Sequence, residues 1–230
     1  MKQWADGDKI YASDLNELVS SGNLVFANAA ARDAFLVNEL APTPGVTVNM
    51  QDDQITYRRI AVAGTNYWAP VSGTHLVCVT MQTAVNMTNN TATQITNMTT
   101  IKTRNTGNMW ANNRFTPTIP GWYEFDAHVI YSNNLAGDGY RAAWLSLNGA
   151  STATAIPGSW NQIYPVNAPG SALTVATRNI SYYFTGIDGA YVTLMGMHNS
   201  TTASFPLSVY AGTSTNPAYA TSFSAKYLGT

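Results

Sequence analysis

Residues 120–131 of the chain, PGWYEFDAHVIY, decide the fold because they alternate between apolar and polar side chains. The apolar positions are Tyr123, Phe125, Ala127, Val129 and Tyr131. Glu124, Asp126 and His128 lie between them. Successive side chains of a strand point to opposite faces of its sheet, so this pattern predicts a long strand with one buried face. Pro120-Gly121 predicts a tight turn in front of that strand.

Other segments after residue 73 share this period of two. Residues 143–147 repeat it and end at Asn148-Gly149, the strongest short hairpin signal in the chain. Further strands are predicted at residues 180–184, 190–195, 207–211 and 222–228. No helical period interrupts them. The sequence therefore predicts a mainly β protein whose C-terminal part, residues 73–230, is an antiparallel sandwich or barrel.

Residues 1–72 have a different pattern and are predicted to form a separate N-terminal segment. One short helix is expected around Leu15 and Leu18, ending at Gly22. A second is expected from Asn28 through Leu36, because Asn is a favoured helix cap and Pro42 follows. Alternating apolar residues between positions 46 and 68 then predict a small β-meander. Such a segment has little core of its own.

Composition limits the possible partners. Hydrophobic residues make up 45% of the chain and charged residues only 10%, with a formal net charge of -1. A folded β protein with a polar, Asn- and Thr-rich surface is expected, and nucleic acid is not expected as a partner because no basic run is present. No segment is long and apolar enough to cross a membrane, and the start has no secretory signal, so synthesis in a cytoplasm is expected. Cys78 is the single cysteine, which excludes an intrachain disulfide.

Several motifs of the C-terminal part resemble the C1q/TNF-like family. They are NTGNMW at 105–110, RFTP at 114–117, PGWYEF at 120–125, LSLNG at 145–149 and TSFSAKYL at 221–228. In the last motif Ala225 stands where the family has glycine. The resemblance covers roughly residues 76–230 and implies a jelly roll that associates as a homotrimer. It also implies that Tyr123, Phe125, Phe223 and Tyr227 pack in the core or at a threefold axis.

The N-terminal part resembles bacteriophage proteins. Residues 4–16, WADGDKIYASDLN, are similar to the opening of many phage tail and fibre proteins. ARDA at 31–34, PGV at 44–46 and YW at 67–68 resemble another phrase common in such proteins. The resemblance implies a virion component, made in the bacterial host and held by another virion protein through this segment. The residues expected to make that attachment are Trp4, Ile10, Leu15, Asn16 and Leu18.

Aromatic residues in predicted loops suggest a ligand site in the C-terminal part. Tyr140, Trp160 and Tyr164 lie beside Asn161, Gln162 and Asn134, a combination of stacking faces and hydrogen-bonding amides. Carbohydrate sites use the same combination, so a sugar on the host surface is a candidate ligand. The alternative is that these aromatic residues pin loops down or contact neighbouring subunits.

No catalytic or metal-binding motif is found, so neither an enzyme nor a cofactor is expected. His75, His128 and His198 are far apart in the sequence and have no shared metal-ligand spacing. Three hypotheses for the function remain. The first is a trimeric phage structural protein, similar to a tail fibre, whose head binds a host receptor. The second is an architectural decoration or connector protein of the capsid or tail with no receptor. The third is an enzyme that degrades surface polysaccharide.

Overall fold

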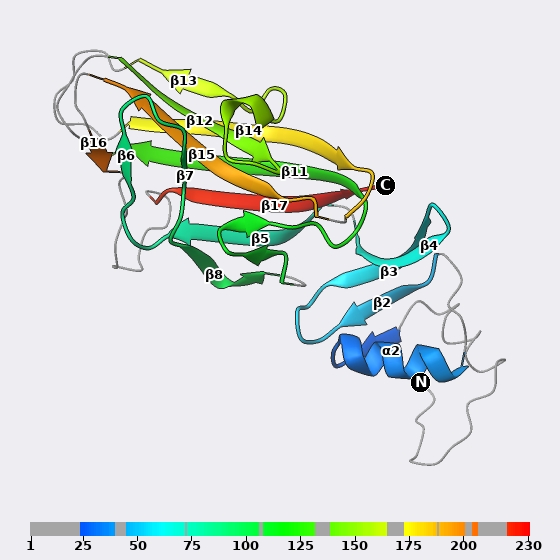
Figure 1. Ribbon diagram of the computed structural model, residues 1–230. Helices are drawn as coiled ribbons and strands as arrows, with labels where there is room; N and C mark the ends of the chain where they lie inside the picture. Colours follow the sequence, from blue (N-terminus) through cyan, green and yellow to red (C-terminus); the bar gives the residue numbers. More distant parts are fainter. Residues whose placement is uncertain are drawn as a thin grey trace. The chain divides into compact units, whose positions relative to one another are not determined.

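The chain is mainly β and divides into two compact units, Met1–Ser72 and Gly73–Thr230 (Figure 1). The computed structural model describes residues 24–39, 45–71, 73–105, 108–131, 139–164, 173–187, 189–200, 204–206 and 220–230. The helix expected around Leu15 and the strand expected at residues 207–211 lie outside this description.

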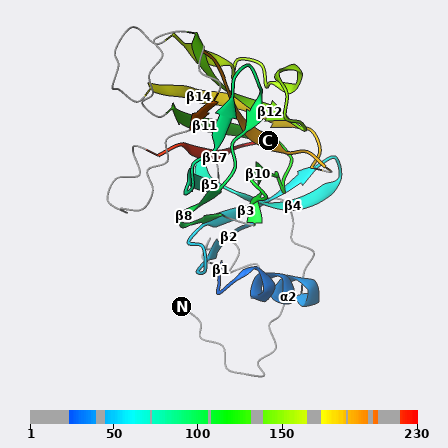
Figure 2. The ribbon, with the colours of Figure 1, turned by 60° about the vertical axis from the view of Figure 1, so that its left-hand side comes forward.

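The N-terminal unit contains one sheet with the strand order β1-β2-β3-β4. The strands are β1 (Leu24–Phe26), β2 (Thr47–Met50), β3 (Thr56–Val62) and β4 (Thr65–Pro70). β2, β3 and β4 are antiparallel and form the predicted meander. The sequence pattern does not predict β1, which lies parallel to β2 with Leu24 opposite Val48 (Figure 2).

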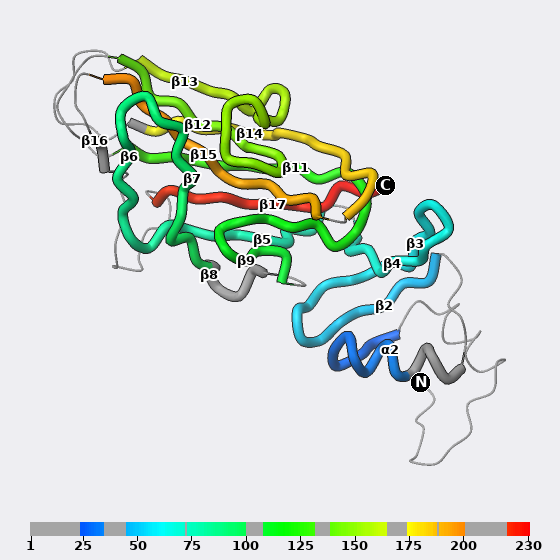
Figure 3. The backbone as a smooth tube through the Cα atoms, in the orientation of Figure 1, coloured from blue at the N-terminus to red at the C-terminus, as the bar shows by residue number. Residues whose placement is uncertain are grey.

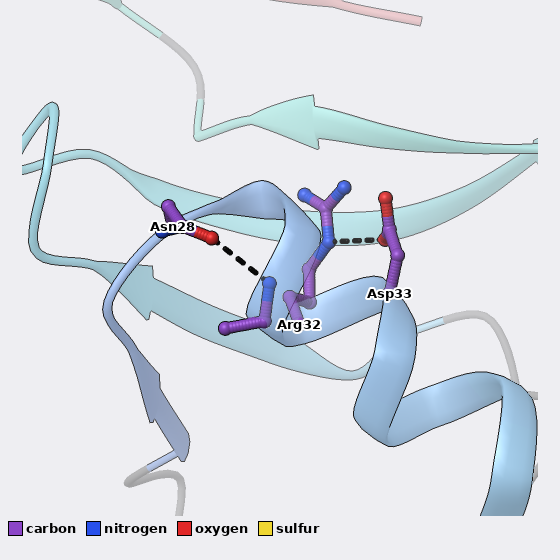
Figure 4. Close-up of polar contacts among 4 residues, drawn as sticks. Asn28, Arg32 and Asp33 are labelled. Atoms are coloured by element: carbon purple, nitrogen blue, oxygen red, sulfur yellow. Dashed lines mark hydrogen bonds and ion pairs between the residues drawn. The ribbon is translucent and has the colours of Figure 1, made fainter.

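Helix α2 (Ala29–Glu39) connects β1 to β2 and confirms the predicted second helix. Asn28 precedes it, and its side-chain Oδ1 accepts a hydrogen bond from the backbone N–H of Ala31 at 2.9 Å (Figure 4). An Asn side chain in this position satisfies a backbone donor that the first turn would otherwise leave free. The helix continues three residues beyond Leu36, the predicted end.

A small core holds this unit together. Leu24, Val48 and Met50 are buried, and Phe26, Val46, Tyr57 and Trp68 pack against them. Arg32 of α2 places its guanidinium 4.9 Å from the ring centroid of Trp68 and pairs with Asp33 (Figure 4). A cation over an indole face is attractive, so Arg32 joins the helix to β4.

The C-terminal unit is a sandwich of two main antiparallel sheets. The first has the order β14-β11-β17-β5-β8, and these strands lie side by side in Figures 1 and 2. Their bounds are β5 (Thr74–Met81), β8 (Met98–Asn105), β11 (Gly121–Tyr131), β14 (Leu173–Phe184) and β17 (Ser222–Gly229). β11 lies between the edge strand β14 and the central strand β17.

The second sheet has the order β13-β12-β15-β10-β9, with β7 also paired to β15. Its strands are β7 (Thr93–Gln94), β9 (Trp110–Ala111), β10 (Arg114–Phe115), β12 (Tyr140–Leu147), β13 (Asn161–Ile163) and β15 (Val192–Asn199). β6 (Asn86–Thr88) and β16 (Ser204–Pro206) form a separate pair. The chain passes back and forth between the two main sheets, so the unit is the predicted jelly-roll sandwich.

The core between the sheets is aromatic. Phe115 of the second sheet contacts Tyr123, Phe125 and Phe223 of the first, with ring centroids 5.4, 5.3 and 6.3 Å away. Tyr123, Phe125, Phe223 and Tyr227 are each at most 2% exposed. The sequence left open whether these four rings pack in the core or at a threefold axis. The structure places them in the core of a single subunit.

Two turns frame this core. Gly121 has φ 142°, and a Cβ there would lie 2.6 Å from the carbonyl oxygen of Gly229, so only glycine fits beside β17. At the end of β12, Asn148 has φ 51° and ends the strand as expected. The hairpin after Asn148 is longer than predicted, because the chain returns antiparallel to β12 only at Ala155, opposite Ser146. Asn148 bonds instead to Tyr191 through its backbone N–H and its Oδ1. The next strand, β13, begins only after the short helix η2 (Thr152–Thr154).

Replacing Phe115 with Ala is expected to lower the free energy of unfolding of the C-terminal unit by about 3–5 kcal/mol, because the cavity would lie between three aromatic rings. Denaturant unfolding followed by tryptophan fluorescence measures the loss. Thr118→Ala, at an exposed position on the same connection, is the matched control and should change stability little. An equal effect of the two substitutions would contradict this account of the core.

Candidate functional site

The candidate site lies on β13, an edge strand of the second sheet (Figure 3). β13 pairs with β12 so that Ala142 is opposite Gln162. Because side chains alternate along a strand, Trp160, Gln162 and Tyr164 lie on one face, and we call these three residues the β13 row. Tyr140 and Trp144 of β12 share that face.

Each exposed ring of the β13 row is supported by a ring of β12. Trp160 stacks on Trp144, with centroids 4.7 Å apart and an interplanar angle of 28°. Trp144 is fully buried, and its Nε1 donates a hydrogen bond to the carbonyl oxygen of Ser151. Tyr164 meets Tyr140 edge to face at 6.2 Å. Trp160 is 37% exposed and Tyr164 is 63% exposed, so both supported rings remain open to solvent.

The amide of Gln162 connects the two rings. Trp160 Nε1 donates to Gln162 Oε1 at 3.3 Å, and Gln162 Nε2 donates to the hydroxyl of Tyr164 at 3.4 Å. Both distances exceed the usual 2.7–3.2 Å for such bonds, so both bonds are weak. A ligand hydroxyl in better position would replace either of them at low cost.

The structure brings together three of the four residues predicted to bind a ligand. Tyr140, Trp160 and Tyr164 share one face, whereas Asn161 alternates to the other. The side-chain amide of Asn161 donates to the carbonyl oxygen of Ala176 at 2.6 Å and thereby ties β13 to β14. The sequence analysis named Gln162 only as a neighbour of the aromatic residues. In the structure, its amide lies between the two rings, where the amide of Asn161 was expected. Asn134 lies outside the described residues.

The opposite face of β12 and β15 is buried and largely apolar, and a polar group of residues lies at one end of it, where Arg141 is opposite His198. His198 is fully buried, and its Nε2 donates to the carbonyl oxygen of Met87 at 2.8 Å while its Nδ1 faces the hydroxyl of Ser200. Burial lowers the pKa of His198, and the nearby Arg141 lowers it further, although the bond to Met87 opposes both effects. The hydroxyl of Tyr131 reaches across from the first sheet to the carbonyl oxygens of β12 and β15. These contacts hold β11, β12 and β15 together.

Acidification is expected to destabilise the C-terminal unit through His198. Its pKa in the folded state lies below the ordinary value of about 6.5, so below that pH the unfolded chain binds the proton first and stability falls. Thermal unfolding between about pH 7.5 and 5 should show a decline that is shallower in His198→Gln. His128 has a lowered pKa from burial and Arg178, so His128→Gln separates its contribution. Parallel curves for the wild type and His198→Gln would refute the assignment.

The outer face of the first sheet is a second surface of interest. Trp122 is 46% exposed and packs beside Tyr183, with centroids 5.3 Å apart. Next to this pair on the same face, Lys226 and Glu124 form an ion pair. This face therefore combines an exposed indole with an ion pair.

Other expected features are placed as follows. Trp4, Ile10, Leu15, Asn16 and Leu18, the predicted attachment residues, lie outside the described residues. Within the part of the chain that the structure describes, no three His, Cys, Asp or Glu side chains gather in a way that could hold a metal ion. The described helices include none that is long and apolar enough to span a membrane.

Known proteins offer little guidance. The sequence matches no protein family and no curated protein. Among solved structures, the chain is similar to one from the structure of infectious bursal disease virus, Gt strain, with a TM-score of 0.35 and 8% identity. The match covers 76% of this chain and 44% of that chain, so it spans less than half of the viral chain's length. A likeness this distant does not indicate function, which is therefore argued from the residues alone.

Proposed function

We propose that this protein is a structural component of a bacteriophage particle whose jelly-roll unit is displayed as a homotrimer and binds carbohydrate on the host surface. The N-terminal unit joins the particle by binding another virion protein. The observation on which the receptor-binding role rests is the β13 row, with two exposed rings supported from beneath and an amide between them.

Carbohydrate fits the β13 row because of its chemistry. A sugar presents a face of C–H groups, which packs on an aromatic ring, and a rim of hydroxyl groups, which needs hydrogen-bond partners. Trp160 and Tyr164 supply the rings, and Gln162 supplies both a donor and an acceptor. Exposed aromatic rings of this kind cost free energy in water, so a site that keeps two of them is better explained by a ligand than by folding.

Two observations support the display of a trimer on a phage particle. The sequence motifs of the C-terminal unit resemble a family of trimeric jelly rolls, and those of residues 4–16 resemble phage tail and fibre proteins. The outer face of the first sheet carries the exposed Trp122. Burying such an indole between subunits would stabilise a particle protein that has a single cysteine and so no intrachain disulfide.

The receptor-binding role is tested by competition for host cells. Purified full-length protein added in excess is expected to block adsorption of the phage, because it occupies the same surface carbohydrate. The measurement is the fraction of free phage after mixing with host cells, and Tyr164→Ala protein is the matched control that should block less. Undiminished adsorption at saturating wild-type protein would contradict the role. Release of saccharide fragments from host envelope would indicate an enzyme instead.

The attachment role is tested by truncation. Protein lacking residues 1–72 is expected to stay soluble and trimeric, because the jelly roll has its own core, but to be absent from particles. Light scattering measures the number of chains, and immunoblotting of purified particles measures incorporation. Normal incorporation of the truncated chain would show that the jelly roll makes the attachment, and a monomer would contradict the trimer.

The alternative is an architectural decoration or connector protein without a receptor. One observation favours it: Trp160 stacks on Trp144, whose Nε1 holds Ser151, so the row also pins the connection between β12 and β13 to the sheet. In that case, loss of the protein would weaken the particle to heat or dilution and leave adsorption by the surviving particles unchanged.

A further inference from the structure

We infer that the β13 row binds a neutral, linear glycan that lies along β13 and places one sugar ring on Trp160 and another on Tyr164. This inference rests on the proposed carbohydrate-binding function and specifies the class of carbohydrate. It follows from the spacing of the rings, from their support and from the absence of charge in the row.

The spacing sets a minimum length for the ligand. Trp160 and Tyr164 are four positions apart on the same face, which corresponds to about 13 Å along an extended strand. Their supporting rings, Trp144 and Tyr140, are four positions apart on β12 in the matching register. A single pyranose ring is too short to cover both platforms. A chain of linked sugars running parallel to the strand covers both, with an intervening segment over Gln162.

The rings are held in place before any ligand arrives. Trp160 rests on a fully buried indole, and Tyr164 rests on Tyr140. The weak hydrogen bonds through Gln162 add little to this support. Binding therefore immobilises few side chains that were free before, which lowers its entropic cost. The long bonds of Gln162 exchange readily for bonds to sugar hydroxyls, because an amide both donates and accepts.

The charge of the site selects a neutral ligand. No residue of the row is charged, and neither is Tyr140 or Trp144 beneath it. The charged residue of β12 is Arg141, which is 2% exposed and alternates to the opposite face of the sheet, beside His198. A sugar acid or sulfated sugar would lose part of its hydration at the row and gain no counter-charge there. Acidic polysaccharides should therefore bind more weakly than neutral ones.

The experiment measures binding of full-length protein to oligosaccharides of defined length. The probes are neutral gluco-, galacto-, manno- and rhamno-oligosaccharides of one to six sugars, together with oligogalacturonates as acidic counterparts. Tryptophan fluorescence and calorimetry report affinity. For the preferred neutral series, affinity should rise as the chain becomes long enough to cover both rings and then level off.

Variants locate the binding site. Tyr164→Ala should weaken the longer probes by about tenfold and abolish the gain with length, because the platform under the second sugar is lost. Tyr164→Phe keeps the ring and should bind nearly as the wild type does. Gln162→Ala should weaken binding without abolishing the length dependence. Tyr67→Ala, in the N-terminal unit, is the control outside the row. Light scattering on every variant excludes an effect on assembly.

The outcomes separate this inference from the function on which it rests. Three outcomes would overturn the inference and leave receptor binding intact. They are glycan binding that Tyr164→Ala does not weaken, affinity that does not depend on glycan length, and a preference for the oligogalacturonates. A change in the number of chains in Tyr164→Ala would show that the row is a subunit contact, which also overturns it. Failure of every probe to bind, combined with no competition for host cells, would overturn both.

Discussion

The C-terminal unit depends on contact between Phe115 and the aromatic face of β11. Phe115 belongs to a strand of only two residues, yet its ring reaches three rings of the opposite sheet. Rings at these distances add edge-to-face attraction to the burial of apolar surface. This contact joins the two sheets without using β13, which lies at the other end of the second sheet from β10. The exposed rings of β13 take no part in the contact between the sheets.

The two main sheets present different outer faces. The first sheet exposes an indole next to an ion pair, and the second exposes uncharged rings and an amide along its edge strand. A jelly roll that assembles through one sheet and recognises a ligand with the other needs this kind of asymmetry. The proposed assignment of assembly to the first sheet and recognition to the second follows from the chemistry of these faces.

Much of the fold follows from local patterns in the sequence. β11 could be predicted because apolar and polar side chains alternate from Tyr123 to Val129, and α2 could be predicted because Asn28 precedes an alanine-rich run. β1 could not, because three residues carry no period and its partner β2 lies beyond a helix. The connection after β12 is longer than the short hairpin that Asn148-Gly149 predicts, because the chain returns beside β12 only at Ala155, and no local pattern reveals that length.

The sequence predicts the region of the candidate site but not all of its residues. Aromatic residues near position 160 indicate a binding surface by composition alone, but the face on which each side chain lies depends on the register between β13 and β12. That register separates Asn161 from Gln162, although the two residues are adjacent and chemically alike. Sequence composition identifies the neighbourhood of such a site, and strand pairing decides its members.

Asparagine, together with glycine, shapes many turns of the protein. In the part of the chain that the structure describes, nine residues other than glycine have positive φ, and seven of them are asparagine. The asparagine side chain tolerates this conformation by bonding to nearby backbone, and it carries no charge. Ionic strength changes interactions between charged groups, so it has little effect on the conformation of these uncharged asparagine turns. The surface that they frame would keep the same geometry in dilute fresh water and in brine.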